Sequence, residues 1–164
     1  MSKQDEIVSY IDYISDFYLS VRLRSEKEMR DYLSRKLKRY ELESDEIQVL
    51  VDTKIAKLQK YDLINDLKFA QLYADEKSRF KQRGAYRIKL ELQKKGISNE
   101  IISQALSQRE EEDSDILPRL LMSRYKNVDW KDLKMRQKAI QGLMRRGFGI
   151  NDIKKSIEEF LSEE

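Results

Sequence analysis

Basic residues gather in three stretches of this sequence, and clustered cations are the groups with which proteins bind polyanions. Residues 22–39 contain eight Lys or Arg against three acids, residues 79–95 seven against one, and residues 131–146 six against one. Acidic segments lie between them, at 41–52 and 110–115. For any single lysine, a solvated helix surface is the simpler interpretation. Three recurring basic stretches favour a stripe of positive charge that attracts nucleic acid or an acidic groove on a protein.

The usual catalytic side chains are missing from the chain. Its 164 residues include no Cys and no His, which removes thiol nucleophiles, disulfides, the commonest zinc ligands and the usual general base near neutral pH. Glu110, Glu111 and Glu112 could hold Mg²⁺ or form an acid–base pair, but an uninterrupted acidic run is more typical of a solvated linker. We therefore expect no enzyme activity, no metal and no cofactor.

The composition predicts an all-α protein. Charged residues make up 38% of the chain and apolar residues 40%, and its five Gly and single Pro are too few for the turns of a strand-rich fold. No apolar stretch approaches the roughly 18 residues needed to span a bilayer. The N-terminal residues also lack the basic start and apolar run of a signal peptide. We expect a soluble, cytoplasmic, monomeric protein that does not associate with membranes.

One phrase occurs twice. Residues 92–102 read LQKKGISNEII and residues 143–153 read LMRRGFGINDI, at an offset of 51 residues. Apolar residues at four-residue spacing lead into each phrase, as on one face of a helix. Gly96 and Gly147 then stand where glycine ends a helix in the left-handed conformation. The two cations before each glycine suit the negative end of the helix dipole, so the phrase predicts a helix, a tight stop and a second helix.

Helix-start signals and a looser upstream copy of the phrase predict how the rest of the chain divides into helices. Ser25 is expected to cap the second helix and Asp66 the fourth. The pattern predicts about nine helices in three tandem three-helix repeats, at residues 1–62, 63–109 and 110–164. A unit of this size rarely folds alone. The repeats are therefore expected to bury their apolar faces against one another in an elongated, curved stack.

Aromatic residues at helical spacing suit either a hydrophobic core or a stacking surface for unpaired bases. On the first and fourth expected helices they are Tyr10, Tyr13, Phe17, Tyr18, Phe69, Tyr73 and Phe80. We expect most of them to pack in the core. Phe148 is expected to close over its helix joint, whereas Trp130 suits either role.

Three segments resemble the RecX family of recombinase regulators. They read LSVRLRSEKEMRDYLSRK at 19–36, LINDLKFAQLYADEKSRFKQRGAYRIKLELQKKGIS at 63–98 and LMRRGFGINDI at 143–153. The middle segment is the most specific. Its matching positions are Asp66, Phe69, Ala70, Arg79, Gly84, Leu92, Lys95, Gly96 and Ile97. The resemblance covers nearly the whole chain from about residue 15.

The resemblance implies tandem three-helix repeats and a regulatory role. Proteins of this family bind RecA-type recombinases, particularly the filament assembled on single-stranded DNA, and suppress its ATP hydrolysis and strand exchange in recombination and DNA repair. Some also bind single- or double-stranded DNA. The resemblance and the basic stretches together lead us to expect that a set of cations contacts the partner or nucleic acid. They are Arg22, Arg24, Arg35, Lys36, Arg79, Arg83, Arg87, Lys94, Lys95, Arg145 and Arg146.

Two other functions stay open from the residues alone. A stand-alone helical DNA-binding protein would insert one of the short helix joints into a groove without any recombinase. A helical-repeat scaffold would cradle a peptide in a groove of apolar or mixed character. The blocks of charge speak mildly against the scaffold, and the family resemblance speaks strongly against it.

Overall fold

The fold consists of helices alone wherever the structure describes the chain. This computed structural model describes residues 3–107 and 115–162, and within them it contains no strand. The predicted all-α class is confirmed. Among the described helices, none is long and apolar enough to cross a membrane.

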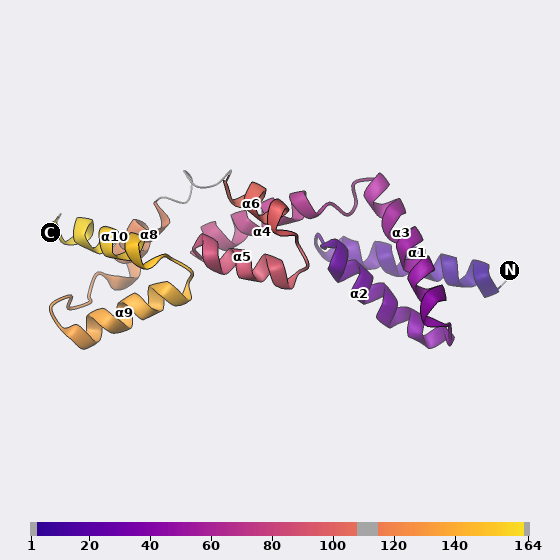
Figure 1. Cartoon of the computed structure of the whole chain (residues 1–164), viewed down its shortest axis with the longest axis horizontal. Helices are drawn as coiled ribbons and strands as arrows, with labels where there is room; N and C mark the ends of the chain where they lie inside the picture. Colours follow the sequence, from indigo (N-terminus) through magenta and orange to yellow (C-terminus); the bar gives the residue numbers. More distant parts are fainter. Residues whose placement is uncertain (1–2, 108–114, 163–164) are drawn as a thin grey trace. The chain divides into compact units, whose positions relative to one another are not determined.

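Within residues 3–107 and 115–162, the α-helices follow one another in three sets of three, as predicted (Figure 1). The first set is α1 (Lys3–Val21), α2 (Glu26–Leu37) and α3 (Ser44–Lys60), with a 3₁₀ turn, η1 (Lys38–Tyr40), after α2. The second set is α4 (Asp66–Arg79), α5 (Ala85–Lys94) and α6 (Asn99–Ser107). The third set is α8 (Ile116–Leu120), α9 (Leu133–Arg145) and α10 (Ile150–Ser162), and a π-helical segment, η2 (Leu121–Tyr125), continues α8.

Two compact units divide these helices. The first consists of Met1–Phe69 with Lys95–Ser98, and the second of Ala70–Lys94 with Asn99–Glu164. The division passes through α4 and assigns the loop after α5 to the first unit. The repeat boundaries expected after residues 62 and 109 stay predictions, and the second of them lies outside the described residues.

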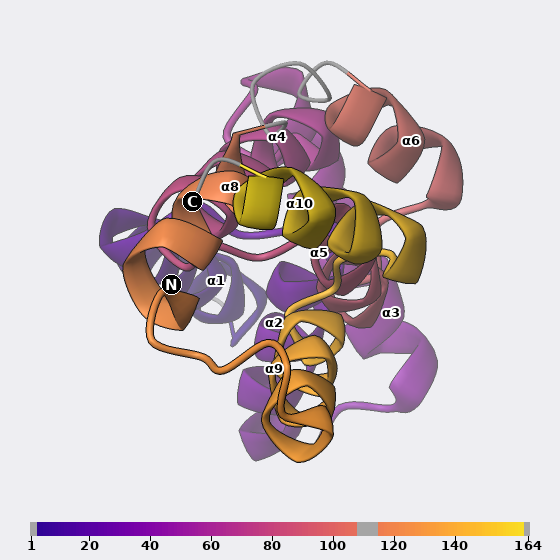
Figure 2. The same ribbon diagram turned by 90° about the vertical axis from the view of Figure 1, so that its left-hand side faces the viewer.

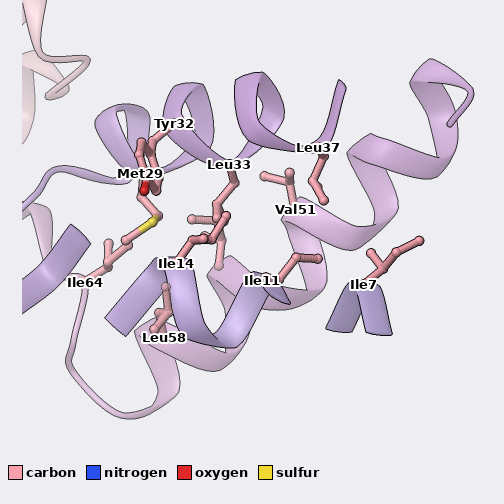
Figure 3. Packing of buried hydrophobic residues seen from close by; sticks show 11 residues of the cluster. Ile7, Ile11, Ile14, Met29, Tyr32, Leu33, Leu37, Val51, Leu58 and Ile64 are labelled. Carbon is pink, nitrogen blue, oxygen red and sulfur yellow. The ribbon is translucent and has the colours of Figure 1, made fainter. Parts of the chain in front are cut away.

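An apolar core between α1, α2 and α3 holds the first unit together (Figure 3). On α1, Ile7, Ile11 and Ile14 recur at the spacing that gives a helix one apolar face. Met29 and Leu33 of α2 are fully buried in the same cluster. Its other members are Tyr32, Leu37, Val51, Ile55, Leu58 and Ile64. Because burying one such side chain contributes about 1.5–3 kcal/mol, this cluster is the main source of the unit's stability.

A capping box starts α2, and its N-cap is Ser25, as the sequence predicted. The Ser25 hydroxyl accepts a hydrogen bond from the Glu28 amide at 3.2 Å, and the Glu28 carboxylate accepts one from the Ser25 amide at 3.3 Å. Two amides that have no partner within the helix are satisfied in this way.

The expected role of Asp66 is wrong. Asp66 is the first residue of α4, and the side chain of Asn65 accepts from the Lys68 amide at 2.9 Å in its place. The Asp66 carboxylate instead accepts from the Glu26 amide at 2.8 Å, at the start of α2. The sequence could not reveal this, because the amide that Asp66 binds lies 40 residues away along the chain.

A second core lies among α8, η2, α9 and α10, whose course is also visible in Figure 2. Leu120, Leu143 and Ile153 are fully buried in it. Trp130 is buried in the same cluster, which decides its role in favour of packing, and Phe148 packs against the cluster as predicted.

The expected burial of the aromatic residues is correct for some and wrong for others. Phe69 is buried, and Tyr10 and Tyr18 pack against the first core. Tyr13, Phe17 and Phe80 are each more than half exposed. On α1 the three isoleucines form the inner face, which leaves two of these aromatic positions on the solvent side of the helix.

Both phrase glycines end their helices in the left-handed conformation, as predicted. Gly96 has φ +81° and Gly147 has φ +95°. After α9, the Gly147 amide donates to the Met144 carbonyl at 2.9 Å and the Phe148 amide to the Leu143 carbonyl at 3.4 Å. This pair of hydrogen bonds is the Schellman motif, which satisfies carbonyls at the end of a helix.

Replacing Gly147 by Ala should destabilise the protein. A side chain other than glycine costs about 1–2 kcal/mol in this backbone conformation, and a Cβ would also stand 2.4 Å from the Arg87 amide nitrogen. We expect urea-induced unfolding, followed by circular dichroism, to show a decrease of at least that size in the free energy of unfolding. In the control Gly149→Ala, the Cβ meets only the side-chain carboxylate of Asp152. Equal decreases in the two variants would contradict this account.

Candidate polyanion-binding groove

The phrase glycines form two equivalent joints, one in each unit. In the first joint, the Ser25 hydroxyl donates to the carbonyl of Lys95 at 2.7 Å. A Cβ on Gly96 would stand 2.6 Å from the Cβ of Lys27, so the glycine turn lies directly against the start of α2. In this joint the glycine turn that follows α5 therefore packs against the start of α2.

The second joint repeats this arrangement one helix set later. The Gly84 amide donates to the carbonyl of Arg146 at 2.8 Å, and Gly147 lies against the backbone of Arg87 at the start of α5. Gly84 is itself so close that a Cβ on it would stand 2.4 Å from the Gly147 oxygen. A glycine is therefore needed on both sides of this contact.

The first joint is closed by a carboxylate. Glu28, three residues after Ser25, accepts from Arg22 at 2.9 Å and from Lys95 at 2.6 Å. Burial alone would raise the pKa of Glu28, but the hydrogen bonds from Arg22, Lys95 and the Ser25 amide outweigh it and lower the pKa from 4.5 to about 2. Two of the expected contact cations are therefore engaged within the molecule.

The second joint carries a cation at the corresponding position. Arg87, three residues after Gly84, stands where Glu28 stands in the first joint. Arg146, the counterpart of Lys95, donates to the main-chain carbonyls of Lys81 and Gln82 at 3.2 and 3.5 Å. Lys81 and Arg145 make no ion pair with any acid in the described parts of the chain. This joint therefore concentrates positive charge. Glu91 pairs with Arg83 and Arg87, and no other acid of the described chain forms an ion pair with the cations of this joint.

A shallow groove of about 730 Å³ lies at the second joint. Five cations line it: Lys81, Arg83, Arg87, Arg145 and Arg146. No acidic residue of the described chain contributes to its lining. Cations without acids on the walls of one concave surface focus a positive potential there, which raises the local concentration of anions.

Tyrosines give the same groove flat apolar surfaces. Tyr86, which is 64% exposed, and Tyr125 lie among its lining residues together with Leu90 and Met144. Exposed aromatic rings beside cations are the combination with which proteins hold the phosphates and stack the bases of unpaired nucleic acid. Chemically, the groove can bind a polyanion, and nothing in its lining suggests catalysis.

The groove brings together four of the eleven expected contact residues. Arg83, Arg87, Arg145 and Arg146 line it, whereas Arg22 and Lys95 belong to the closed first joint. The other five lie outside both: Arg24, Arg35, Lys36, Arg79 and Lys94.

Three of these five accompany two stacked tyrosines in the first unit. The Arg24 guanidinium lies 3.7 Å from the ring centre of Tyr18, whose ring stacks on Tyr32 at 3.9 Å. Arg35 and Lys36 approach the Tyr32 ring at 5.9 and 5.6 Å. Cation–π contacts of this kind bind the cations to their own chain, which makes Arg24 in particular a structural residue.

Several functional residues were missed at the sequence level. Tyr86 and Tyr125 are two of them, and the position of Tyr86 within the basic stretch at 79–95 was a usable signal. The ion pairs of Glu28 were also missed, because Glu28 is one of three acids in its basic stretch and its partner Lys95 lies 67 residues away along the chain. The acidic run from Glu110 to Glu112 lies outside the described residues, and those that the structure describes contain no acidic cluster able to hold a metal ion.

The comparisons with known proteins agree on one family. Residues 65–106, which contain α4, α5 and α6, match the profile of "RecX, second three-helix domain". The chain is 34% identical over 146 residues to the regulatory protein RecX of Bacillus pumilus, covering 87% of this chain and 52% of that protein. It is 34% identical over 149 residues to the RecX protein of Listeria monocytogenes serotype 4a, covering 89% and 52%. The chain thus spans about half the length of the curated relatives it matches.

A solved structure extends this similarity to the fold. The crystal structure of RecX from Lactobacillus salivarius superposes with a TM-score of 0.72 at 29% sequence identity. The match covers 94% of this chain and 97% of that one.

The closed first joint leads to a pH-dependent prediction. The pKa of Glu28 is about 2 in the folded protein and near 4.5 in the unfolded chain. The contribution of Glu28 to the free energy of unfolding is therefore present above pH 4.5 and disappears as the pH falls toward 2. At pH 7, Glu28→Gln should lower the free energy of unfolding by on the order of 2 kcal/mol. Chemical unfolding at several pH values measures this difference.

The control is Glu159→Gln, because Glu159 forms an exposed pair with Lys155 at 3.8 Å and such pairs contribute about 1 kcal/mol or less. If the difference between Glu28→Gln and the unaltered protein stayed constant from pH 7 to pH 2, the ion-pair cluster would not be its cause.

Proposed function

The chain belongs to the RecX family, and from that premise we propose that it binds a RecA-type recombinase. The partner is the filament on single-stranded DNA, and binding lowers its ATP hydrolysis and strand exchange in recombination and DNA repair. The protein acts by binding rather than by catalysis, and it acts in the cytoplasm as a monomer. Its helices serve as three repeats, at residues 1–62, 63–109 and 110–164.

The groove at the second joint is the observation that carries this proposal. A recombinase filament on DNA presents two sources of negative charge, the phosphates of the strand and the acidic side chains of the protomers. Lys81 and Arg145, which no acid of the described chain neutralises, are the cations best able to meet either of them. Binding through such contacts weakens steeply with salt, because each one releases counterions.

The remaining expected cations take different parts in the proposal. Arg22 and Lys95 stabilise the first joint and need not touch the partner. Arg79 and Lys94 are exposed outside the groove and supply secondary contacts, as do Arg35 and Lys36 at the end of α2. Many weak contacts along a repeating partner add up, since the first one raises the effective concentration of the rest.

A stand-alone DNA-binding protein that acts without a recombinase is the alternative. The tyrosines of the groove favour it, because Tyr86 offers an exposed ring beside Arg83 and Arg87. Base stacking on such a ring is tolerant of sequence. Under this alternative, the chain would bind single-stranded DNA tightly and leave the recombinase unaffected.

Reversing the two unpaired groove charges should impair inhibition. We expect the unaltered protein to inhibit ATP hydrolysis by the cognate RecA-type recombinase on single-stranded DNA at well below one copy per protomer. The double variant Lys81→Glu with Arg145→Glu should need about tenfold more protein for half-inhibition, because two polyanion contacts become repulsive. A coupled ATPase assay measures this shift.

Lys154→Glu is the matched control, since Lys154 is an exposed cation on α10 outside the groove. It should inhibit like the unaltered protein. Tight binding to single-stranded DNA without any effect on ATP hydrolysis would rule out the recombinase role and favour the stand-alone DNA binder. Equal inhibition by all three proteins would place the interface outside this groove.

A further inference from the structure

One acidic residue lies behind the groove and touches two of its cations. The Arg87 Nε donates to the Glu91 carboxylate at 2.8 Å, and the Arg83 guanidinium donates to both of its oxygens. Tyr73, on α4, donates to the same carboxylate at 3.0 Å. Glu91 therefore joins the loop before α5, the helix itself and the neighbouring helix α4.

From this geometry we propose that Glu91 is a positioning residue, which holds Arg83 and Arg87 in the orientation that binds phosphate groups in the groove. The proposal rests on the proposed function in one respect, the use of this groove for a polyanion. It adds that the affinity depends on a carboxylate that never touches the ligand.

Glu91 is placed to hold the arginines rather than to compete with the ligand for them. Its side chain is only 14% exposed and does not line the groove, whereas Arg87 is 48% exposed and lines it. Arg83, Arg87 and Tyr73 all donate to the carboxylate, so it cannot swing outward without breaking its hydrogen bond with Tyr73. Arg87 is held through Nε, which leaves the terminal nitrogens of its guanidinium available to a phosphate.

The electrostatics fit a fixed support of this kind. Burial alone would raise the pKa of Glu91, but the hydrogen bonds from Arg87, Tyr73 and Arg83 outweigh burial and lower it. Burial, together with the hydrogen bond to Glu91, raises the pKa of the Tyr73 hydroxyl to about 12. The carboxylate therefore stays ionised and the phenol stays protonated across the pH range in which the groove would work.

Glu28 and Glu91 illustrate two uses of a carboxylate beside a joint. Glu28 binds Arg22 and Lys95, the counterparts of Lys81 and Arg146, and leaves the first joint closed. Glu91 stands one helical turn after Arg87 and contacts neither Lys81 nor Arg146 through any described ion pair. Glu91 thus orients Arg83 and Arg87 and leaves Lys81, Arg145 and Arg146 without an ion pair to any acid of the described chain.

Glu91→Gln tests the proposal, because positioning and competition predict opposite signs. A labelled oligothymidine serves as the probe, and fluorescence anisotropy over a range of NaCl concentrations gives the affinity and its dependence on salt. We expect Glu91→Gln to bind about three- to tenfold more weakly, even though it removes a negative charge. The slope of log K against log salt should become shallower by about 0.7 for each phosphate that the variant no longer binds.

Asp75→Asn is the matched control, since it also removes one carboxylate paired with an arginine, Arg79, outside the groove. It should bind the oligothymidine as tightly as the unaltered protein or slightly more tightly. Tyr73→Phe removes only the hydroxyl that supports Glu91 and should weaken binding in the same direction by a smaller factor. Circular dichroism shows whether each variant is folded under the binding conditions.

Each outcome supports or overturns the positioning role. Tighter binding by Glu91→Gln would make Glu91 a competitor, and unchanged binding would make it irrelevant to the groove, so either overturns the proposal. If Lys81→Glu with Arg145→Glu abolishes binding while Glu91→Gln does not weaken it, only the positioning role fails. No binding by the unaltered protein, or full binding by the double variant, overturns this use of the groove for nucleic acid as well.

Discussion

The left-handed glycine turn at the end of a helix is the constraint on which both joints depend. Gly96 and Gly147 adopt positive φ values, and each presses against the first turn of the second helix in the preceding helix set. Neither position has room for a Cβ, so the backbones approach more closely than side chains would allow. The close approach lets the carbonyl of the preceding cation accept a hydrogen bond, from the Ser25 hydroxyl in one joint and the Gly84 amide in the other.

The residue three positions after Ser25 or Gly84 then sets the local charge of each joint. Glu28 in the first joint collects Arg22 and Lys95 into a partly buried cluster, which stabilises the fold and engages both cations within the molecule. Arg87 takes the corresponding place in the second joint and adds to the positive charge. The same backbone geometry therefore yields a closed structural contact in one unit and a basic groove in the other. Repetition of a fold does not imply repetition of a function.

Similarity to known proteins and geometry contribute different parts of the functional conclusion. Similarity to RecX proteins supplies the class of partner, a RecA-type recombinase filament, as a proposal for this chain. The groove supplies a location and a chemistry, namely five cations, two of them paired with Glu91, beside the exposed Tyr86 and with no acid of the described chain on the walls. Glu91, behind the walls, links the folding of α4 and α5 to the orientation of two arginines. Under the proposed function, recognition and stability share residues at this joint.

The described helices, their order in sets of three, the glycine stops and the N-cap at Ser25 could all be predicted from the sequence. Each of these follows from residues within a few positions of one another, where local periodicity and backbone preference set the outcome. Which cations are available, in contrast, depends on long-range contacts that form only in the folded chain. Lys95 and Arg146 occupy the same place in the repeated phrase, yet one binds Glu28 and the other lines a groove, because their partners lie about 65 residues away. Asp66, which binds an amide at the start of α2, is a third example, since a side chain's local surroundings cannot reveal a partner that only folding brings near.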